Sequence, residues 1–83
     1  MTEVVITVAK DGTLFLDKDP IMLTGLQYSL QDKLKKMKKP SVRIKANRNA
    51  MLGVVVNVVD EIHLAGAGAF SIETEKKGKE SVR

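Results

Sequence analysis

The residues of this chain that could carry catalytic or metal-binding chemistry are few and widely spaced. His63 is the only histidine, and Asp60 lies three positions before it, where a helix would place the two side by side. Zinc usually takes at least three protein ligands, and this pair supplies two. Cysteine is absent, which excludes thiolate ligands, disulfides and a cysteine nucleophile. We therefore expect no metal, no cofactor and no catalytic residue.

Two pairs of carboxylates, Asp17 with Asp19 and Asp60 with Glu61, are the candidates for acid–base chemistry. The first pair falls in a predicted turn. The second falls on a predicted helix, where neighbouring positions do not face each other. No apolar pocket that would raise a carboxyl pKa is evident in the sequence. We expect both pairs to be solvated and the chain not to be an enzyme.

The segment Gly66-Ala67-Gly68 has the composition of a phosphate-binding loop but the wrong position. Phosphate loops follow a strand and open a helix, because the phosphate sits at the helix N-terminus. These glycines follow a predicted helix and precede a predicted strand. The sequence therefore favours a helix cap and a tight turn.

Basic residues crowd the middle of the chain, whose net charge is +4. They are Lys33, Lys35, Lys36, Lys38, Lys39, Arg43, Lys45 and Arg48. Such a cluster fits an anionic partner, such as nucleic acid, lipid headgroups or a wall polymer, and it equally fits a solvated helix face. RNA-binding sheets stack bases on exposed strand aromatics. The strand aromatics here, Phe15 and Phe70, have neighbours that suggest core positions, so we expect no nucleic-acid partner.

The length of 83 residues allows one small domain. Association with a second copy would increase the stability of such a domain. Residues 1–3 lack the features of a signal peptide. The longest apolar run, residues 51–59, is broken by Gly53 and Asn57 and falls short of a membrane helix.

Hydrophobic periodicity predicts the elements of the first half. Residues 3–8 and 14–16 favour strands, joined by a hairpin turn at Asp11-Gly12. Residues 17–20 are predicted to be a loop. A leucine-rich stripe then recurs at steps of three and four, which is typical of a helix. We expect Thr24 and Gln27 to form its capping box and Pro40 to end it.

The second half is predicted to contain a strand, a helix and a strand. Residues 41–46 alternate between apolar and basic side chains, as in a half-buried strand. Residues 51–64 are ambiguous, because their valines favour a strand while their spacing and length favour a helix. We interpret them as a helix capped by Asn49 and closed by Gly66. Residues 69–74 form the last predicted strand.

These elements predict an α+β fold: a small mixed β-sheet with two helices on one face, in the order ββαβαβ. The domain is expected to span residues 1–74, and residues 75–83 a polar disordered tail.

Three segments carry a family resemblance. They are residues 10–16 (KDGTLFL), 42–48 (VRIKANR) and 55–60 (VVNVVD), the last followed by Ala65-Gly66. In this order and spacing the chain, from about residue 4 to residue 74, resembles the extracytoplasmic domain of the ExbD/TolR family, which are subunits of proton-driven motors in the bacterial inner membrane. It departs from the family pattern at Asn47, where Asp is common, and near Met51, where Tyr is common.

The resemblance implies a periplasmic domain of a single-pass inner-membrane protein. The family's membrane helix and its proton-handling Asp are missing from this sequence, so we expect a fragment with Met1 supplied by expression. The implied partners are a second copy, an ExbB/TolQ-like membrane subunit reached through the missing helix, a TonB/TolA-like effector peptide and peptidoglycan. The ExbD and TolR branches both remain open.

The resemblance, together with the exposed apolar pattern, predicts a surface for dimerisation and peptide binding. It comprises Ala69, Phe70, Ser71, Ile72, Glu73, Thr74, Leu52, Val56 and Val59. The alternative function is a small basic nucleic-acid-binding module that uses residues 33–48.

Overall fold

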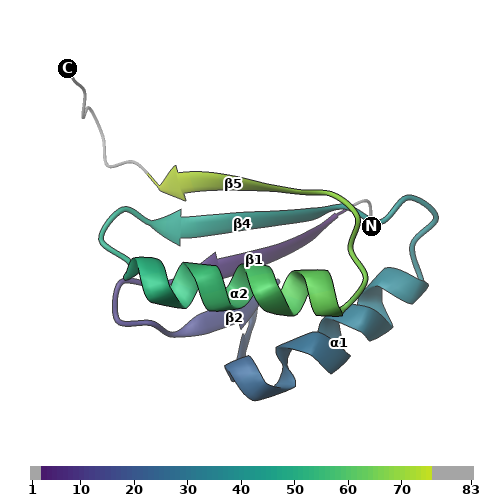
Figure 1. The fold of residues 1–83 in the computed structure, drawn as a ribbon, viewed down its shortest axis with the longest axis horizontal. Helices are drawn as coiled ribbons and strands as arrows, with labels where there is room; N and C mark the ends of the chain where they lie inside the picture. Colours follow the sequence, from purple (N-terminus) through teal and green to yellow (C-terminus); the bar gives the residue numbers. More distant parts are fainter. Residues whose placement is uncertain (1–2, 76–83) are drawn as a thin grey trace.

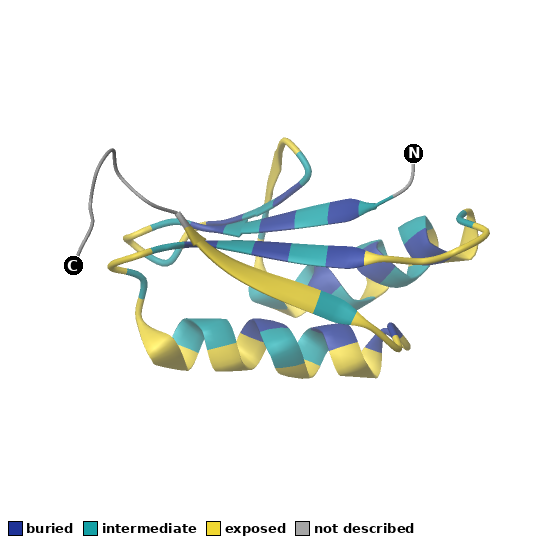
Figure 2. Cartoon of the chain, turned by 90° about the horizontal axis from the view of Figure 1, so that it is seen from above, coloured by how far each residue is buried: buried dark blue, intermediate teal, exposed yellow. Residues whose placement is uncertain are grey.

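Five strands form one mixed sheet, and two helices cover one of its faces in the computed structural model, which describes residues 3–75 (Figures 1 and 2). The strands are β1 (Val4–Val8), β2 (Leu14–Leu16), β3 (Asp19–Ile21), β4 (Val42–Asn47) and β5 (Phe70–Glu75). The helices are α1 (Leu23–Lys35) and α2 (Leu52–Leu64). The α+β class and the placement of both helices on one face are confirmed.

The sheet has an antiparallel half and a parallel half. Its strand order is β3-β2-β1-β4-β5, with β1, β2 and β3 joined antiparallel and β1, β4 and β5 joined parallel. Short turns can connect antiparallel neighbours, whereas parallel neighbours need a long crossover. The helices α1 and α2 supply those crossovers. In this strand order, β3 and β5 are the two edges of the sheet.

The core lies between the sheet and the helices. The alternation predicted from the sequence holds in β1 and β4, where every second side chain is buried. The largest fully buried side chains come from β1, β4 and both helices: Ile6, Leu26, Leu30, Ile44, Ile62, Val4, Val8, Val42 and Val58. Each contributes about 1.5–3 kcal/mol by burial. The helical interpretation of residues 51–64 is thereby confirmed, because Val58 and Ile62 face the sheet at helical spacing.

The loop predicted at residues 17–20 is wrong, because the structure forms a third strand there. Leu16 pairs with Asp19, so Asp17 and Lys18 make a two-residue hairpin turn between β2 and β3. Asp17 adopts a positive φ of 58°, which short hairpin turns require and which Asp tolerates better than most residues. The element order is therefore βββαβαβ rather than ββαβαβ.

The predicted N-terminal caps of both helices are also wrong. Met22 occupies the N-cap of α1, and Thr24 lies inside the helix. Met51 occupies the N-cap of α2, whereas Asn49 donates its backbone N–H to Asn47 Oδ1 at 2.8 Å in the preceding turn. Neither cap residue makes a side-chain hydrogen bond, so the helices depend on packing rather than on capping boxes.

The predicted C-terminal cap of α2 is confirmed. Gly66 has a φ of 91°, and its N–H bonds the His63 carbonyl at 3.0 Å. The N–H of Ala67 bonds the Ile62 carbonyl at 3.2 Å. This pair of bonds is the Schellman motif, in which the left-handed residue is usually glycine. The motif turns the chain toward β5, which extends from Phe70 to Glu75 and so includes the first residue of the tail predicted at 75–83. The rest of that predicted tail lies outside the described residues.

Candidate functional site

The strand β5 forms one edge of the sheet. It pairs in parallel with β4 from Phe70, opposite Val42, to Glu75, opposite Asn47. On its other side it has no strand neighbour among residues 3–75. Along a strand, successive N–H and C=O groups point to opposite sides, so every second residue of β5 directs its backbone groups outward. The predicted residue Ala69 lies immediately before this strand and is exposed.

The side chains of β5 that face the helices are incompletely covered. Ile72 is aligned with the fully buried Ile44 of β4 but is itself 50% exposed. Phe70 packs partly against the core, and its ring meets that of His63 edge-on at a centroid distance of 5.5 Å. Ser71, Glu73 and Thr74 are exposed. Burial of the apolar side chains therefore decreases from β4 to β5.

The helix α2 adds a second apolar surface. Leu52 is 77% exposed and Val56 is 49% exposed, one helical turn apart, which places them on one side of the helix. Val59, predicted to belong to the same exposed face, is instead half-buried and packs against the core. Two of the three predicted α2 residues are thus available to a partner.

An arginine links β5 to the rest of the sheet on the open face, which is the face that the two helices do not cover. Arg43 of β4 forms ion pairs with Glu3, just before β1, and with Glu73 of β5, the latter at 3.2 Å. The side-chain hydrogen bond and then the charge of Glu3 raise the pKa of Arg43, and Glu73 adds to this shift. The salt bridges therefore link three neighbouring segments, and the Glu73 pair adds a side-chain contact to β5, where core packing is incomplete.

The other edge of the sheet, β3, is chemically different. It contains Pro20, which has no backbone N–H. The residues that flank a two-residue hairpin turn exchange the ladder hydrogen bonds, here Leu16 and Asp19, so the next residue, Pro20, points its backbone outward. An incoming strand would miss its donor at that position.

The carboxylates Asp17 and Asp19 do not form the simple solvated pair that the sequence predicts. Asp17 Oδ1 accepts the Val5 backbone N–H at 3.1 Å, and its Oδ2 pairs with Lys33 Nζ at 3.1 Å. Both aspartates also line an open cavity beneath β3. The cavity could not be found from the sequence, because its walls come from β1, β2, β3 and α1 together.

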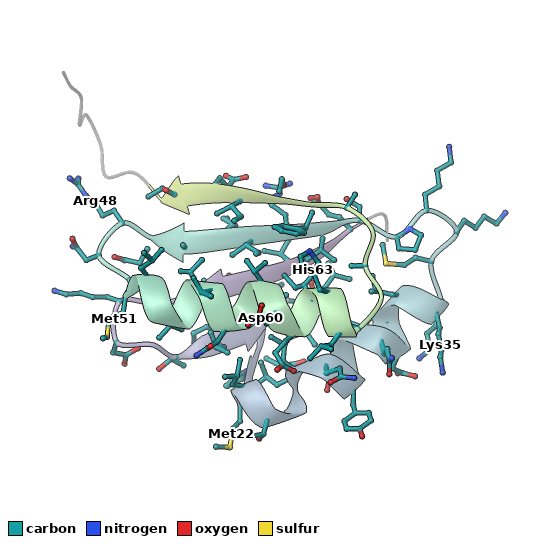
Figure 3. The ribbon with its side chains drawn as sticks, in the orientation of Figure 1. Met22, Lys35, Arg48, Met51, Asp60 and His63 are labelled. Atoms are coloured by element: carbon teal, nitrogen blue, oxygen red, sulfur yellow. The ribbon has the colours of Figure 1, made fainter. Side chains whose placement is uncertain are left out.

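The only histidine, His63, lies on α2 beside β5, and Asp60 lies on the outward side of the same helix (Figure 3). Among residues 3–75, no group of three His, Cys, Asp or Glu side chains is arranged to hold a metal ion. The expected core position of Phe70 is partly confirmed. That of Phe15 is wrong, because it lies on the open face, between the buried Leu14 and Leu16.

The basic residues do not gather into one patch. Lys33 and Lys36 of α1 are paired with Asp17 and Asp32 respectively. Arg43 and Lys45 alternate with buried residues of β4 and so lie on the open face, away from the helices. Lys35 and Arg48 lie at opposite ends of the long axis (Figure 3).

A search of curated proteins gives no match. A family model described as "Biopolymer transport protein ExbD/TolR" matches residues 1–77, which is most of the chain. Within residues 3–75, neither helix is long and apolar enough to cross a membrane. The chain belongs to the ExbD/TolR family of biopolymer transport proteins.

Proposed function

We propose that this chain acts as the periplasmic domain of an inner-membrane energy-transducing complex of the Ton or Tol type, which the proton motive force drives. In this role it dimerises and binds an effector protein of the TonB or TolA kind. Family membership supports the transport role. The observation that carries the binding role is the free edge of β5, the one sheet edge in residues 3–75 without a proline.

The binding mode that fits this edge is strand addition. An extended peptide would pair its backbone with the outward N–H and C=O groups of β5, and its side chains would contact those of Phe70 and Ile72. Exposed edge strands are sites where proteins accept or resist such pairing. The edge of β3 is a poorer acceptor, because Pro20 cannot donate.

The apolar side chains beside this edge favour association of two copies. Leu52, Val56 and Ile72 are between 49% and 77% exposed. Burying them in a dimer removes apolar surface from water, which stabilises the dimer by about 25 cal/mol per Å² buried. Other partners follow from the family resemblance: an ExbB/TolQ-like membrane subunit and the peptidoglycan of the cell wall.

Dimerisation is tested by light scattering over a concentration series. We expect the mean mass to rise toward that of two chains, and the double change of Leu52 and Val56 to serine to shift the transition to higher concentration. Met22, which is 75% exposed at the start of α1, provides the control, because Met22→Ser removes exposed apolar surface elsewhere. A constant monomer mass at the highest concentration would exclude the dimer.

Strand addition is tested with two proline variants, Ser71→Pro and Ile72→Pro. Adjacent residues of β5 direct their N–H groups to opposite sides, so one variant removes a bond to β4 and the other removes an outward donor. We expect the variant that loses a bond to β4 to have a lower thermal midpoint. We expect the variant that loses an outward donor to keep its fold and to bind a TonB- or TolA-type peptide with lower affinity. Calorimetric titration and circular dichroism separate these effects. If both folded variants bind like the parent, the peptide does not pair with β5.

A further inference from the structure

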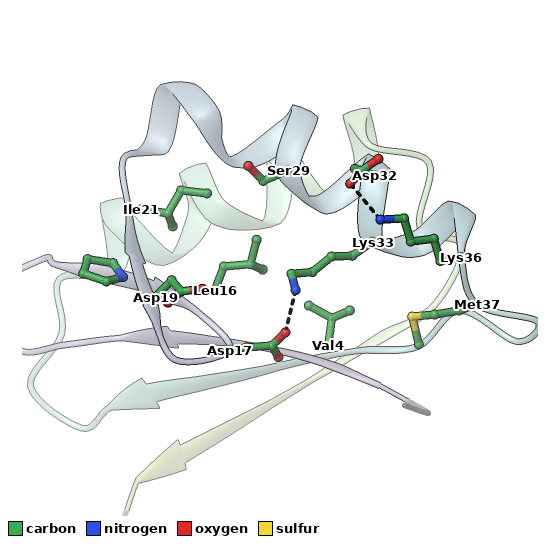
Figure 4. Close-up of a pocket in the computed structure, with 11 residues that line it drawn as sticks. Val4, Leu16, Asp17, Asp19, Ile21, Ser29, Asp32, Lys33, Lys36 and Met37 are labelled. Carbon is green, nitrogen blue, oxygen red and sulfur yellow. Dashed lines mark hydrogen bonds and ion pairs between the residues drawn. The ribbon is translucent and has the colours of Figure 1, made fainter.

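An open cavity of about 600 Å³ lies between α1 and the β2–β3 hairpin, on the side of the sheet away from β5 (Figure 4). Small-molecule and side-chain sites commonly occupy about 300–1,000 Å³. The apolar part of the wall comes from Val4, Leu16, Pro20, Ile21 and Met37. The first two of these are almost fully buried, so they provide a fixed apolar surface rather than a mobile one.

The charged part of the wall is nearly, but not completely, neutralised from within. Three aspartates and two lysines line the cavity, a formal charge of −1 in a chain whose net charge is +4. Lys33 crosses from α1 to Asp17 at the β2–β3 turn, with Nζ–Oδ2 at 3.1 Å (Figure 4). Lys36 is paired with Asp32 at 3.4 Å.

The remaining carboxylate, Asp19, is the unmatched charge of the cavity. No hydrogen bond or ion pair from its side chain to another residue of the described chain is present. Asp17, in contrast, already receives the Val5 N–H and the Lys33 ammonium. A ligand that complements this wall needs one positive charge and an apolar stem.

The same hairpin limits how such a ligand can enter. Pro20, which lines the cavity, has no N–H to point outward from the middle of β3, so an added strand would lack a backbone donor there. Insertion of a single long side chain needs no backbone pairing. Lysine and arginine combine an aliphatic stem with a terminal cation, and they commonly bury the stem while the charged group meets a polar rim.

We propose that this cavity binds the side chain of a lysine or arginine presented by an extended peptide, with the stem against Leu16 and Ile21 and the cation at Asp19. The site is separate from β5 and goes beyond the proposed function. It holds whether or not a peptide pairs with that edge.

The test is an NMR titration of the ¹⁵N-labelled chain with three blocked tripeptides: Ala-Lys-Ala, its analogue Ala-norleucine-Ala, which lacks the ammonium group, and Ala-Glu-Ala. The reporters are the amide signals of Asp19, Ile21, Ser29 and Lys33, which line the cavity, and those of β5, which should stay silent. We expect saturable shifts at the cavity with the lysine peptide, weaker affinity for the norleucine peptide and no saturation with the glutamate peptide.

Two variants locate the cation. Asp19→Asn should weaken binding of the lysine peptide up to about fivefold, the factor that one exposed ion pair supplies, and leave the norleucine peptide unaffected. Asp60→Asn, an identical change at an exposed position of α2, should have no effect. Equal affinity for the three peptides, no saturation with the lysine peptide, or unchanged lysine-peptide affinity in folded Asp19→Asn would each overturn the proposal. Shifts confined to β5 would also overturn it while leaving strand addition intact.

Discussion

The antiparallel and parallel halves of the sheet are held together by different means. In the antiparallel half, each connection is a tight turn organised by an aspartate, Asp11 between β1 and β2 and Asp17 between β2 and β3. In the parallel half, β5 follows a whole helix, and the Arg43–Glu73 ion pair links it to β4 on the open face. Aspartates at tight turns therefore organise one half of the sheet, whereas the other half depends on a helical crossover and on a salt bridge.

This difference extends to the two edges. The edge in the antiparallel half is short and carries Pro20, features that proteins use to prevent unwanted strand pairing. The edge in the parallel half is longer, lacks proline and has exposed apolar side chains beside it. We therefore expect association to occur at the β5 edge rather than at the β3 edge. The following predictions test that contrast.

The largest expected effect is at the turn of the antiparallel half. Asp17→Ala removes the acceptor of the half-buried Val5 N–H and places alanine at a φ of 58°. Each of these costs about 1 kcal/mol, so we expect the free energy of unfolding to fall by about 2 kcal/mol in urea titrations. Asp17→Asn keeps the acceptor and tolerates this φ, and should lose less than half as much. Equal losses in the two variants would contradict this role of the turn.

In the parallel half, Arg43→Met should loosen β5 selectively. The substitution removes both ion pairs, with Glu3 and with Glu73, but keeps an unbranched side chain on the open face. We expect a smaller loss of global stability than for Asp17→Ala, with faster amide hydrogen exchange concentrated in β5. Lys45→Met, at the next open-face position of β4, is the matched control. Uniform acceleration across the whole sheet would show that these ion pairs do not act locally.

Removing the proline should make the two edges more alike. Pro20→Val restores an N–H at the outward position of β3 without placing a new side chain in the core. We expect extra, concentration-dependent association beyond that of the parent, measurable by sedimentation velocity, and little change in the unfolding midpoint. If Pro20→Val associates no more than the parent, the proline does not protect this edge.

The smallest effect is expected at the β1–β2 turn. The backbone N–H and then the hydroxyl of Thr13 lower the pKa of Asp11 below its ordinary value. A carboxyl whose folded pKa is lowered stabilises the fold above its unfolded pKa, and this contribution is lost as the pH falls through the folded value. Asp11→Asn should therefore lower the thermal midpoint slightly at neutral pH, and the difference from the parent should vanish in acid. A difference that is constant with pH would exclude this origin.

Much of this fold follows from local signals in the sequence. The Asp11-Gly12 turn, the stripe that contains Leu26 and Leu30, and the closure of α2 at Gly66 are each encoded within a few residues. Residues 51–64 were resolvable because helical spacing and length outweighed the strand propensity of valine. The family itself could be inferred from the order of three such segments.

What the sequence does not reveal depends on contacts between distant segments. β3 has three residues, too few for a period, and its proline argues against a strand unless the strand is known to lie at an edge. Asp17 acquires its role only when Val5 and Lys33 approach it. The half-burial of Val59 and the open-face position of Phe15 likewise depend on which side of the sheet the helices cover.

The central claim, that partners pair with β5, is tested most directly by amide chemical shifts on adding a TonB- or TolA-type effector peptide to the labelled chain. We predict the largest shifts within Phe70–Glu75, with smaller ones at Leu52 and Val56 of α2 and little change in β3. Shifts that cluster on residues 33–39, with the strands silent, would contradict the claim and indicate an electrostatic contact with the basic end of α1.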